Sequence, residues 1–208
     1  MKKNKLVSAL FHVGQYTLVR RMFGKFTVKA IHVDEPVTII VNHSNFYDSL
    51  VLFELQKKGY LSKNTVAMIN KKGAEQFPLF KGIGTVPVSS PMKLSEFKAI
   101  LQVMKSNNLL VFPQGREFHL EQRPVKIEPG VISLLNKNPQ HGLLFVSLYY
   151  SYGEGIRGEI ASSMHYVSGR SRPIENLQRF IEGTMEQQLD ELKEHVVTNQ
   201  FEGYQRLW

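Results

Sequence analysis

Apolar positions along the chain recur with two periods, and segments of the two kinds alternate. Short runs rich in β-branched and aromatic residues predict strands at 27–33, 37–41, 65–69, 85–88, 109–112, 143–150 and 159–167. Apolar residues at helical spacing predict helices at 5–22, 46–57, 72–77, 93–105, 130–136 and 174–196. Strands that alternate with helices are typical of α/β proteins. The pattern therefore predicts an α/β fold with a mixed, largely parallel sheet flanked by helices, in one domain over residues 1–208.

The first predicted helix differs from the others in its charge. Residues 1–33 contain seven Lys and Arg residues and no acid, whereas the remaining chain has 19 bases against 18 acids, so this segment carries most of the net charge of +8. Its apolar residues, among them Leu6, Leu10 and Val13, recur near helical spacing. We therefore expect residues 1–24 to form a basic amphipathic helix on a membrane surface, where each base contributes on the order of 1 kcal/mol on anionic lipid. The alternative is a helix that covers the core.

Composition and charge limit the binding partners and the cellular compartment that we expect for the protein. The basic charge lies on a terminal segment and not along a groove of the domain, so we expect no nucleic-acid partner. The apolar run of the first helix is interrupted well short of the roughly 20 residues that span a bilayer. The chain has no cysteine, which excludes disulfides and thiolate metal sites and is compatible with a reducing cytoplasm. These features predict a cytoplasmic protein that is peripheral on the inner face of the cell membrane.

A histidine and an aspartate stand five residues apart just after the strand predicted at 37–41. Five helical steps of about 100° would place His43 and Asp48 on separate faces, so we expect His43 in a loop and Asp48 in the first helical turn, with Ser44 or Asn45 as N-cap. A neutral imidazole can take a proton from an alcohol near pH 7, and a carboxylate on its other nitrogen fixes the tautomer. The pair predicts a general base with its orienting group. The other interpretation is a loop histidine beside a capping carboxylate.

Two further motifs follow this N-H-x4-D block. Residues 109–116, LLVFPQGR, form a buried-strand pattern that ends in a Pro and a Gly, and residues 71–88 lead from a lysine pair through Pro and Gly into a short apolar strand. With these blocks in this order, the chain resembles the lysophospholipid and glycerol-phosphate acyltransferase family, which includes the 1-acylglycerol-3-phosphate acyltransferases and whose later block is F-P-E-G-T-R-S. The resemblance covers roughly residues 35–150.

The resemblance implies an O-acyltransferase that needs no cofactor or metal. The acyl donor would be a thioester of coenzyme A or of acyl carrier protein, and the acceptor a lipid hydroxyl at the membrane surface. His43 would be the general base and Asp48 the residue that orients it. Asn42 would either hold the loop or hydrogen-bond the acyl carbonyl.

The later motifs supply the expected binding residues. A tight turn near the reacting centre, with backbone N–H groups available to an oxyanion, is predicted for Phe112, Pro113, Gln114 and Gly115. Gln114 would also donate to acceptor hydroxyls. Arg116 is a candidate for binding an acceptor or donor anion, against a solvated or ion-paired arginine. Lys71 and Lys72 are candidates for the coenzyme A phosphates, although exposed lysines are common on any surface.

The chain departs from the family pattern at its cations. Gln114 stands in place of the usual Glu, and Glu117 and Ser90 occupy the frames where two phosphate-holding arginines are expected. A charge-assisted hydrogen bond to phosphate contributes about 1.5 to 3 kcal/mol, so losing two would weaken a phosphate acceptor by several powers of ten. Either Arg116, Arg123 or Lys126 substitutes from a shifted position, or the acceptor is an uncharged alcohol such as a glycolipid or glycosylated terpenoid.

Other chemistries have weaker support in the sequence. The spacing of His119, His141 and His165 matches no metal-ligand pair, so we expect no metal site. Nucleotide-binding glycine motifs and the G-x-S-x-G esterase motif are absent from the sequence. Two alternatives to the transferase stay open: a thioester hydrolase that uses water in place of the alcohol, and a catalytically weak relative that mainly binds lipid.

Overall fold

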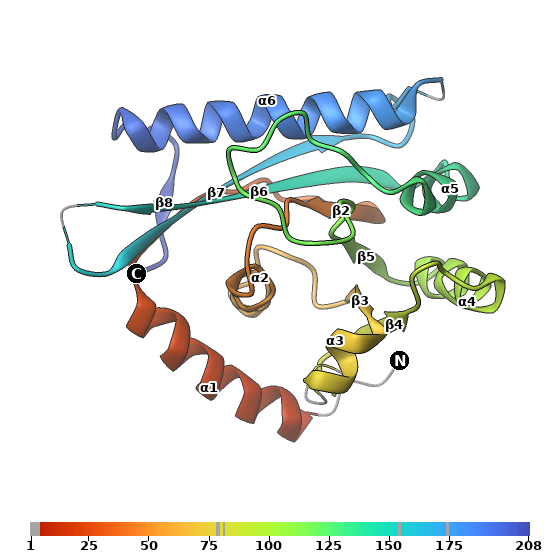
Figure 1. The fold of residues 1–208 in the computed structure, drawn as a ribbon, viewed down its shortest axis with the longest axis horizontal. Coiled ribbons are helices and arrows are strands. Elements are labelled where there is room, and N and C mark those ends of the chain that lie inside the picture. Colours follow the sequence, from red (N-terminus) through yellow and green to blue (C-terminus); the bar gives the residue numbers. More distant parts are fainter. Residues whose placement is uncertain (1–4, 78–79, 81, 154, 174) are drawn as a thin grey trace.

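The protein is built on a single eight-stranded sheet with helices on both faces (Figure 1). The computed structural model describes residues 5–77, 80, 82–153, 155–173 and 175–208, with the side chains of 5–10 and 12 outside the description. The strands are β1 Phe23–Lys29, β2 Val37–Val41, β3 Thr65–Asn70, β4 Thr85–Val88, β5 Asn108–Val111, β6 Gly142–Tyr152, β7 Gly158–Val167 and β8 Gln205–Arg206. The helices are α1 Lys5–Met22, α2 Tyr47–Lys57, α3 Lys71–Gln76, α4 Leu94–Met104, α5 Pro129–Lys137 and α6 Leu177–Val197.

The sheet is mixed and mostly parallel, as the alternating pattern predicts. Its strand order is β4-β3-β5-β2-β6-β7-β1-β8. The strands from β4 to β6 run parallel, β7 is antiparallel to β6, and β1 is parallel to β7. In a sheet of this kind the loops that follow the central parallel strands gather at one edge. The loop after β2 and the loop after β5 therefore lie close together.

Burial on both faces explains why β2 is apolar throughout. Val37, Ile39 and Val41 pack with α1 and α2 on one face, whereas Ile40 packs with α4, α5 and α6 on the other. Figure 1 shows α6 lying along one side of the sheet, with α1 and α2 on the opposite side. A central strand with helices on both faces buries every side chain, so alternation of polar and apolar residues is lost.

Most element boundaries lie within two residues of the sequence-based expectation, and three elements differ more: β1, α6 and β8. β1 begins at Phe23 and ends at Lys29, in place of 27–33, because it starts directly after α1 and pairs with β7 from Phe23 opposite Gly158 to Lys29 opposite Ser163. α6 begins at Leu177, and Ile174, where the last helix was expected to begin, lies outside the described residues. The two-residue strand β8 was not expected.

The described part of α1 covers the core. Phe11 makes edge contacts with Phe53 and Phe80, at 5.0 and 5.6 Å between ring centroids, and Val19 is buried. The Gln15 amide donates a 2.9 Å hydrogen bond to the Glu54 carboxylate of α2. One side of this stretch of α1 therefore packs on the core. The membrane-surface helix expected over residues 1–24 stays a prediction, and residues 1–4 lie outside the description.

Within the described residues, none of the helices combines the length and the apolar character needed to cross a bilayer.

Candidate active site

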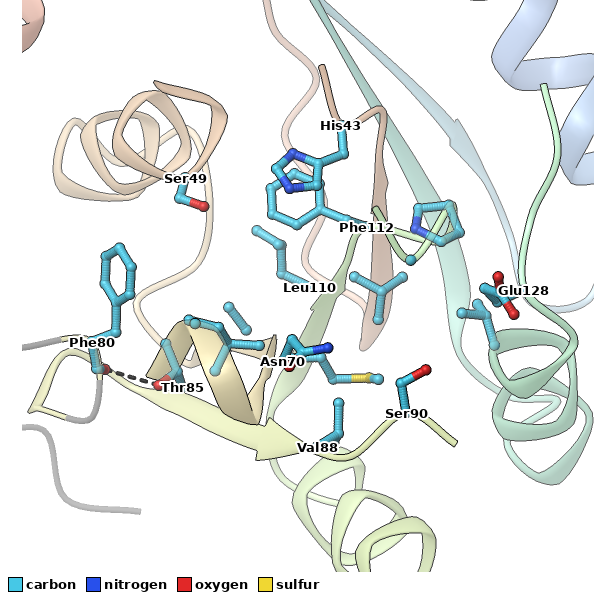
Figure 2. Close-up of a pocket in the computed structure, with 18 of the residues that line it drawn as sticks. His43, Ser49, Asn70, Phe80, Thr85, Val88, Ser90, Leu110, Phe112 and Glu128 are labelled. Atoms are coloured by element: carbon cyan, nitrogen blue, oxygen red, sulfur yellow. Dashed lines mark hydrogen bonds between the residues drawn. The ribbon is translucent and has the colours of Figure 1, made fainter. Parts of the chain in front are cut away.

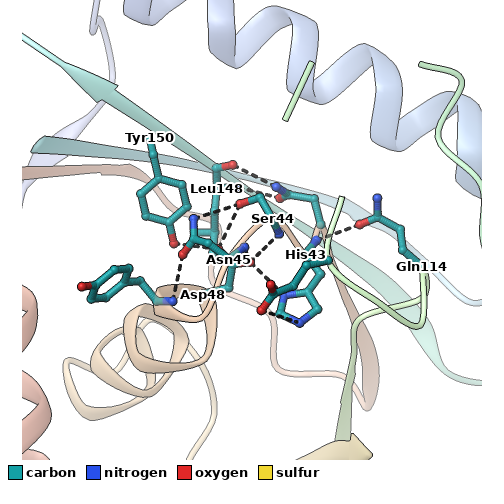
Figure 3. Close-up of polar contacts among 10 residues, drawn as sticks. His43, Ser44, Asn45, Asp48, Gln114, Leu148 and Tyr150 are labelled. Carbon is teal, nitrogen blue, oxygen red and sulfur yellow. Dashed lines mark hydrogen bonds and ion pairs between the residues drawn. The ribbon is translucent and has the colours of Figure 1, made fainter. Parts of the chain in front are cut away.

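The loop after β2 brings the predicted histidine and aspartate into contact. His43 Nδ1 and Asp48 Oδ2 are 2.9 Å apart, which confirms the expected pairing (Figure 3). His43 lies in the loop and Asp48 in the first turn of α2. The N-cap is Phe46 and not Ser44 or Asn45. Asn45 still supports the helix start, because its side-chain oxygen accepts the N–H of Tyr47 at 2.8 Å.

Asp48 is held as a fully enclosed carboxylate. Its side chain is 0% exposed, and Oδ2 accepts the backbone N–H groups of Ser44 at 2.6 Å and Asn45 at 3.0 Å. Oδ2 acts as an acceptor in both of these hydrogen bonds. It accepts from the imidazole as well, so Nδ1 of His43 carries the proton. The lone pair of Nε2 is then available to take a proton from a substrate.

A tyrosine that the sequence did not suggest completes this arrangement. The Tyr150 hydroxyl, from β6, donates a 2.7 Å hydrogen bond to Asp48 Oδ1 (Figure 3). Burial, and then the negative charge of Asp48, raise the pKa of Tyr150 well above its ordinary value, so the hydroxyl keeps its proton. Tyr150 is 102 residues from Asp48. The only sequence signal was a strand predicted across 143–150, which fixes neither its neighbour nor its register.

Asn42 has a structural role in the loop after β2. Its side-chain nitrogen donates to the Leu148 carbonyl at 2.9 Å, and its side-chain oxygen accepts the Leu148 N–H at 2.8 Å. Both ends of the amide are therefore engaged with β6, and the side chain is buried. Asn42 holds the end of β2 against β6, and its contact with an acyl carbonyl stays a prediction.

The predicted tight turn after β5 is present and supports the imidazole. The Phe112 ring stacks on the His43 ring, with centroids 4.2 Å apart and planes at 20°. The Gly115 N–H donates to the Phe112 carbonyl at 3.1 Å, so it closes the turn and is not available to an oxyanion. Gly115 has φ +73°, and a Cβ there would lie 2.8 Å from Cγ of Glu128, so both backbone and space favour glycine.

Residues 114–118 form hydrogen bonds with both the N–H and the carbonyl of His43. The side-chain oxygen of Gln114 accepts the His43 N–H at 2.7 Å, and the Phe118 N–H donates to the His43 carbonyl at 2.8 Å. Gln114 is buried and is not among the residues that line the cavity described below, and its contact with acceptor hydroxyls stays a prediction. The two hydrogen bonds place Glu117 over the imidazole, with Oε1 3.9 Å from Nε2.

The three predicted cations lie outside the cavity lining. Lys71 Nζ forms an ion pair with Glu96 at 2.5 Å and donates to Ser89 Oγ at 3.1 Å, so it is engaged in a local network. The Arg116 guanidinium lies 4.7 Å from the centroid of the Phe118 ring. The Lys72 side chain is exposed, and its predicted contact with donor phosphates stays a prediction.

An apolar cavity opens beside His43. Its volume is about 900 Å³, within the range of roughly 300 to 1,000 Å³ typical of small-molecule sites. Of the predicted site residues, His43, Phe112, Pro113 and Gly115 line it. Figure 2 shows the His43 ring in front of Phe112, with Phe80 and Thr85 across the cavity and the Glu128 carboxylate at another side. The His43 side chain is 20% exposed, so Nε2 can be reached from this space.

The three histidines that the sequence offers as metal-ligand candidates lie in different parts of the fold. His119 lies in the loop after β5, His141 is buried against Met104, and His165 lies in β7 beside Phe145. Over the part of the chain that the structure describes, no group of three or more His, Cys, Asp or Glu side chains is placed to hold a metal ion.

No protein-family model matches the chain, and no curated protein matches its sequence. The chemistry of the site therefore rests on its geometry. A histidine whose Nδ1 is fixed by a buried carboxylate, and whose Nε2 faces a largely apolar space, can accept a proton from a hydroxyl held there.

Proposed function

We propose that the protein is an O-acyltransferase that moves a fatty acyl group from a thioester of coenzyme A or acyl carrier protein to a hydroxyl of a lipid acceptor. The observation that carries this proposal is the placement of His43 Nε2 on an apolar cavity while Nδ1 is bound to Asp48 at 2.9 Å. Over the described residues, no serine hydroxyl is hydrogen-bonded to Nε2. That arrangement favours direct attack by an acceptor alcohol over an acyl-enzyme route.

His43 carries out the proton transfers of the proposed reaction. As the acceptor oxygen attacks the thioester carbonyl carbon, Nε2 takes the hydroxyl proton and Asp48 stabilises the imidazolium that forms. The tetrahedral oxyanion then collapses, the carbon–sulfur bond breaks, and the imidazolium returns the proton to the departing thiolate. The products are an ester and a free thiol, and His43 is neutral again.

The cavity lining supports a fatty acyl chain as the transferred group. Aromatic and aliphatic side chains from α2, β4, α4 and the segment after α3 line much of the space, among them Phe53, Phe77, Val88 and Phe97. Burial of apolar surface contributes about 25 cal/mol for each Å² removed from water, so a long acyl chain would bind here without a specific polar partner. The reacting carbonyl would then lie at the polar end beside His43.

We also propose that the protein works at a membrane surface. Val13 and Leu18 of α1 are exposed, and Arg21 is exposed beside them. Phe11, on the side of α1 opposite Val13, touches Phe53 and Phe80, which both line the cavity. A lipid-bound α1 would therefore bring the cavity close to its lipid substrates.

Product analysis tests the transferase directly. The purified protein is incubated with palmitoyl coenzyme A, with and without a lipid alcohol in phosphatidylcholine vesicles, and the products are identified by mass spectrometry. We expect thiol release together with a new ester that forms only when the alcohol is added. Free fatty acid at the same rate with or without the alcohol would establish the hydrolase instead, and lipid binding without thiol release would establish the lipid-binding alternative.

A further inference from the structure

A carboxylate faces the reacting nitrogen of His43. Glu117 Oε1 lies 3.9 Å from Nε2, beyond hydrogen-bond distance, and the Glu117 side chain is 55% exposed at the cavity. Its backbone position is set by its neighbours, because Gln114 and Phe118 are both hydrogen-bonded to the backbone of His43. Glu117 therefore lies where an acceptor must approach.

The charged side chains among the described residues of the cavity wall are acidic. Among the described residues that line it, the only acids are Glu117 and Glu128, and none is a Lys or Arg. Hydroxyl groups add to the polar part of the wall, from Ser89, Ser90 and Ser133. Figure 2 shows the Glu128 carboxylate and the Ser90 hydroxyl among the side chains that line this space. The polar part of the wall can accept hydrogen bonds from a ligand, and none of its described residues contributes a Lys or Arg.

Two of the cations close in the chain to residues of the cavity wall, Lys71 and Arg116, are engaged in other contacts. Lys71 is paired with Glu96, and the hydrogen bond from Lys71 is the largest cause that lowers the pKa of Glu96 to about 2. Glu96 is therefore ionised at every pH where the protein would act, and the charge of Lys71 is compensated. The Arg116 guanidinium stacks on Phe118 and is not part of the cavity wall.

A phosphate placed against His43 would meet repulsion here. Like charges a few ångströms apart disfavour binding, and a phosphate group needs charge-assisted donors to replace its water shell. A neutral head group with several hydroxyls meets two acceptors, Nε2 and Oε1, at a separation of 3.9 Å. One hydroxyl can donate to Nε2 and react, while its neighbour on the same head group donates to the carboxylate.

Given the acyl transfer proposed above, we propose that the acceptor head group is neutral and hydroxyl-rich, a sugar-type polyol and not a phosphate ester, and that Glu117 is the residue that selects it. The proposal joins two observations: the Glu117 carboxylate 3.9 Å from Nε2, and the absence of a cation among the described residues of the cavity wall. It makes Glu117 a specificity-determining residue that binds the acceptor and does not transfer the proton.

A competition between two acceptors tests the proposal. Monoglucosyl diacylglycerol and lysophosphatidate are offered together, at equal concentration in phosphatidylcholine vesicles, with palmitoyl coenzyme A as donor, and both esters are quantified by mass spectrometry. We expect the wild-type protein to acylate the glucolipid at least tenfold faster. In Glu117→Arg, we expect transfer to the glucolipid to fall at least tenfold and transfer to lysophosphatidate to rise. Glu117→Ala should raise KM for the glucolipid more than it lowers kcat.

The matched control reverses a charge far from the cavity. Glu202→Arg changes the net charge by the same amount at an exposed position near the C-terminus and should keep the wild-type preference. Circular dichroism and thermal unfolding check that all variants are folded, as expected for changes at exposed positions. Preference of the wild-type protein for lysophosphatidate, or an unchanged preference in both Glu117 variants, would overturn the acceptor proposal alone. Formation of neither ester would overturn the acyl transfer itself.

Discussion

Three side chains, Tyr150, Asp48 and His43, form a chain of hydrogen bonds that orients Nε2 of the imidazole toward the cavity. Tyr150 donates to one oxygen of Asp48, the other oxygen accepts from His43 Nδ1, and Nε2 is left for substrate. Each contact is between 2.7 and 2.9 Å, and Asp48 has no contact with solvent. A buried carboxylate that is satisfied in this way holds the imidazole in a single orientation and tautomer.

Removing the Tyr150 hydroxyl tests this arrangement at the level of one atom. In Tyr150→Phe, Asp48 Oδ1 loses its shortest hydrogen bond, and hydrogen bonds to charged groups contribute about 1.5 to 3 kcal/mol. We predict that kcat for ester formation falls about 10- to 100-fold while KM for the acceptor stays near its wild-type value.

The neighbouring tyrosine provides the control. The Tyr149 hydroxyl donates to Glu121, away from Asp48, so Tyr149→Phe removes an equivalent group without touching the site. We expect it to keep wild-type kcat. Equal loss in both variants, or wild-type kcat in Tyr150→Phe, would show that the hydroxyl does not support Asp48.

The site residues that sequence could predict are those whose partners are close in the chain. His43 and Asp48 are five residues apart, so the strand, loop and helix start between them sufficed to predict their contact. Tyr150 depends on which strand lies beside β2, and Glu117 depends on two backbone hydrogen bonds between loops. Neither is encoded in a local pattern. The same holds for Asn42, because its partner Leu148 is 106 residues away in the chain.

At the scale of elements, the hydrophobic pattern predicted where each helix or strand lies in the chain better than where it begins and ends. The bounds of α1, β2 and β4 agree with the prediction, and every side chain of β2 is buried, as its unbroken apolar run indicates. β1 was misplaced, because Phe23 and Phe26 are buried by pairing with β7 while Ile31 is exposed. β8 is too short and too polar to be recognised, since it forms only by pairing with the edge of β1.

His141 links three elements and makes stability depend on pH. It lies at the start of β6, 2.9 Å from the carbonyl of Met104 at the end of α4 and 3.5 Å from the Thr38 hydroxyl of β2. Burial lowers the pKa of His141 below its ordinary value. The unfolded chain therefore binds a proton more readily than the folded protein, so this contribution to stability is present above about pH 6.5 and is lost as pH falls below it.

The histidine can be tested by thermal unfolding across pH 7.5 to 5. We predict that the wild-type thermal midpoint decreases as the pH is lowered below about 6.5. This group changes the free energy of unfolding by at most about 1.4 kcal/mol per pH unit. His141→Gln should have a lower midpoint at neutral pH and a flatter dependence. His32→Gln, at an exposed histidine, should keep the wild-type slope. An unchanged slope in His141→Gln would contradict the assignment.

At the scale of the whole molecule, the two faces of the sheet carry different helices, and the cavity lies at one edge of the sheet. One face is closed by α4, α5 and α6, while the other carries α1 and α2, and the cavity lies at the edge where the loops after β2 and β5 meet. The exposed side of α1 carries Val13 and Leu18, which are 66% and 42% exposed. This side of the molecule is the one we propose to contact lipid.

Vesicle binding tests the orientation of the molecule. We predict that Val13→Gln combined with Leu18→Gln lowers binding to anionic vesicles at least tenfold in a sedimentation assay, because these side chains would no longer enter the lipid surface. The control is Val197→Gln, at a 71% exposed apolar residue of α6, on the opposite face of the sheet (Figure 1). Equal binding by the double variant and the wild-type protein, or equal loss in the control, would exclude α1 as the lipid contact.

The most direct test of the central claim is the rate of acceptor-dependent ester formation by His43→Ala. His43 is 20% exposed and Asp48 keeps its backbone donors in this variant, so we expect the fold and the thermal midpoint to be preserved. General-base catalysis contributes typically about 10²- to 10⁴-fold, so we predict a loss of at least about 100-fold in kcat. A folded His43→Ala protein that forms the ester at the wild-type rate would contradict the proposed mechanism.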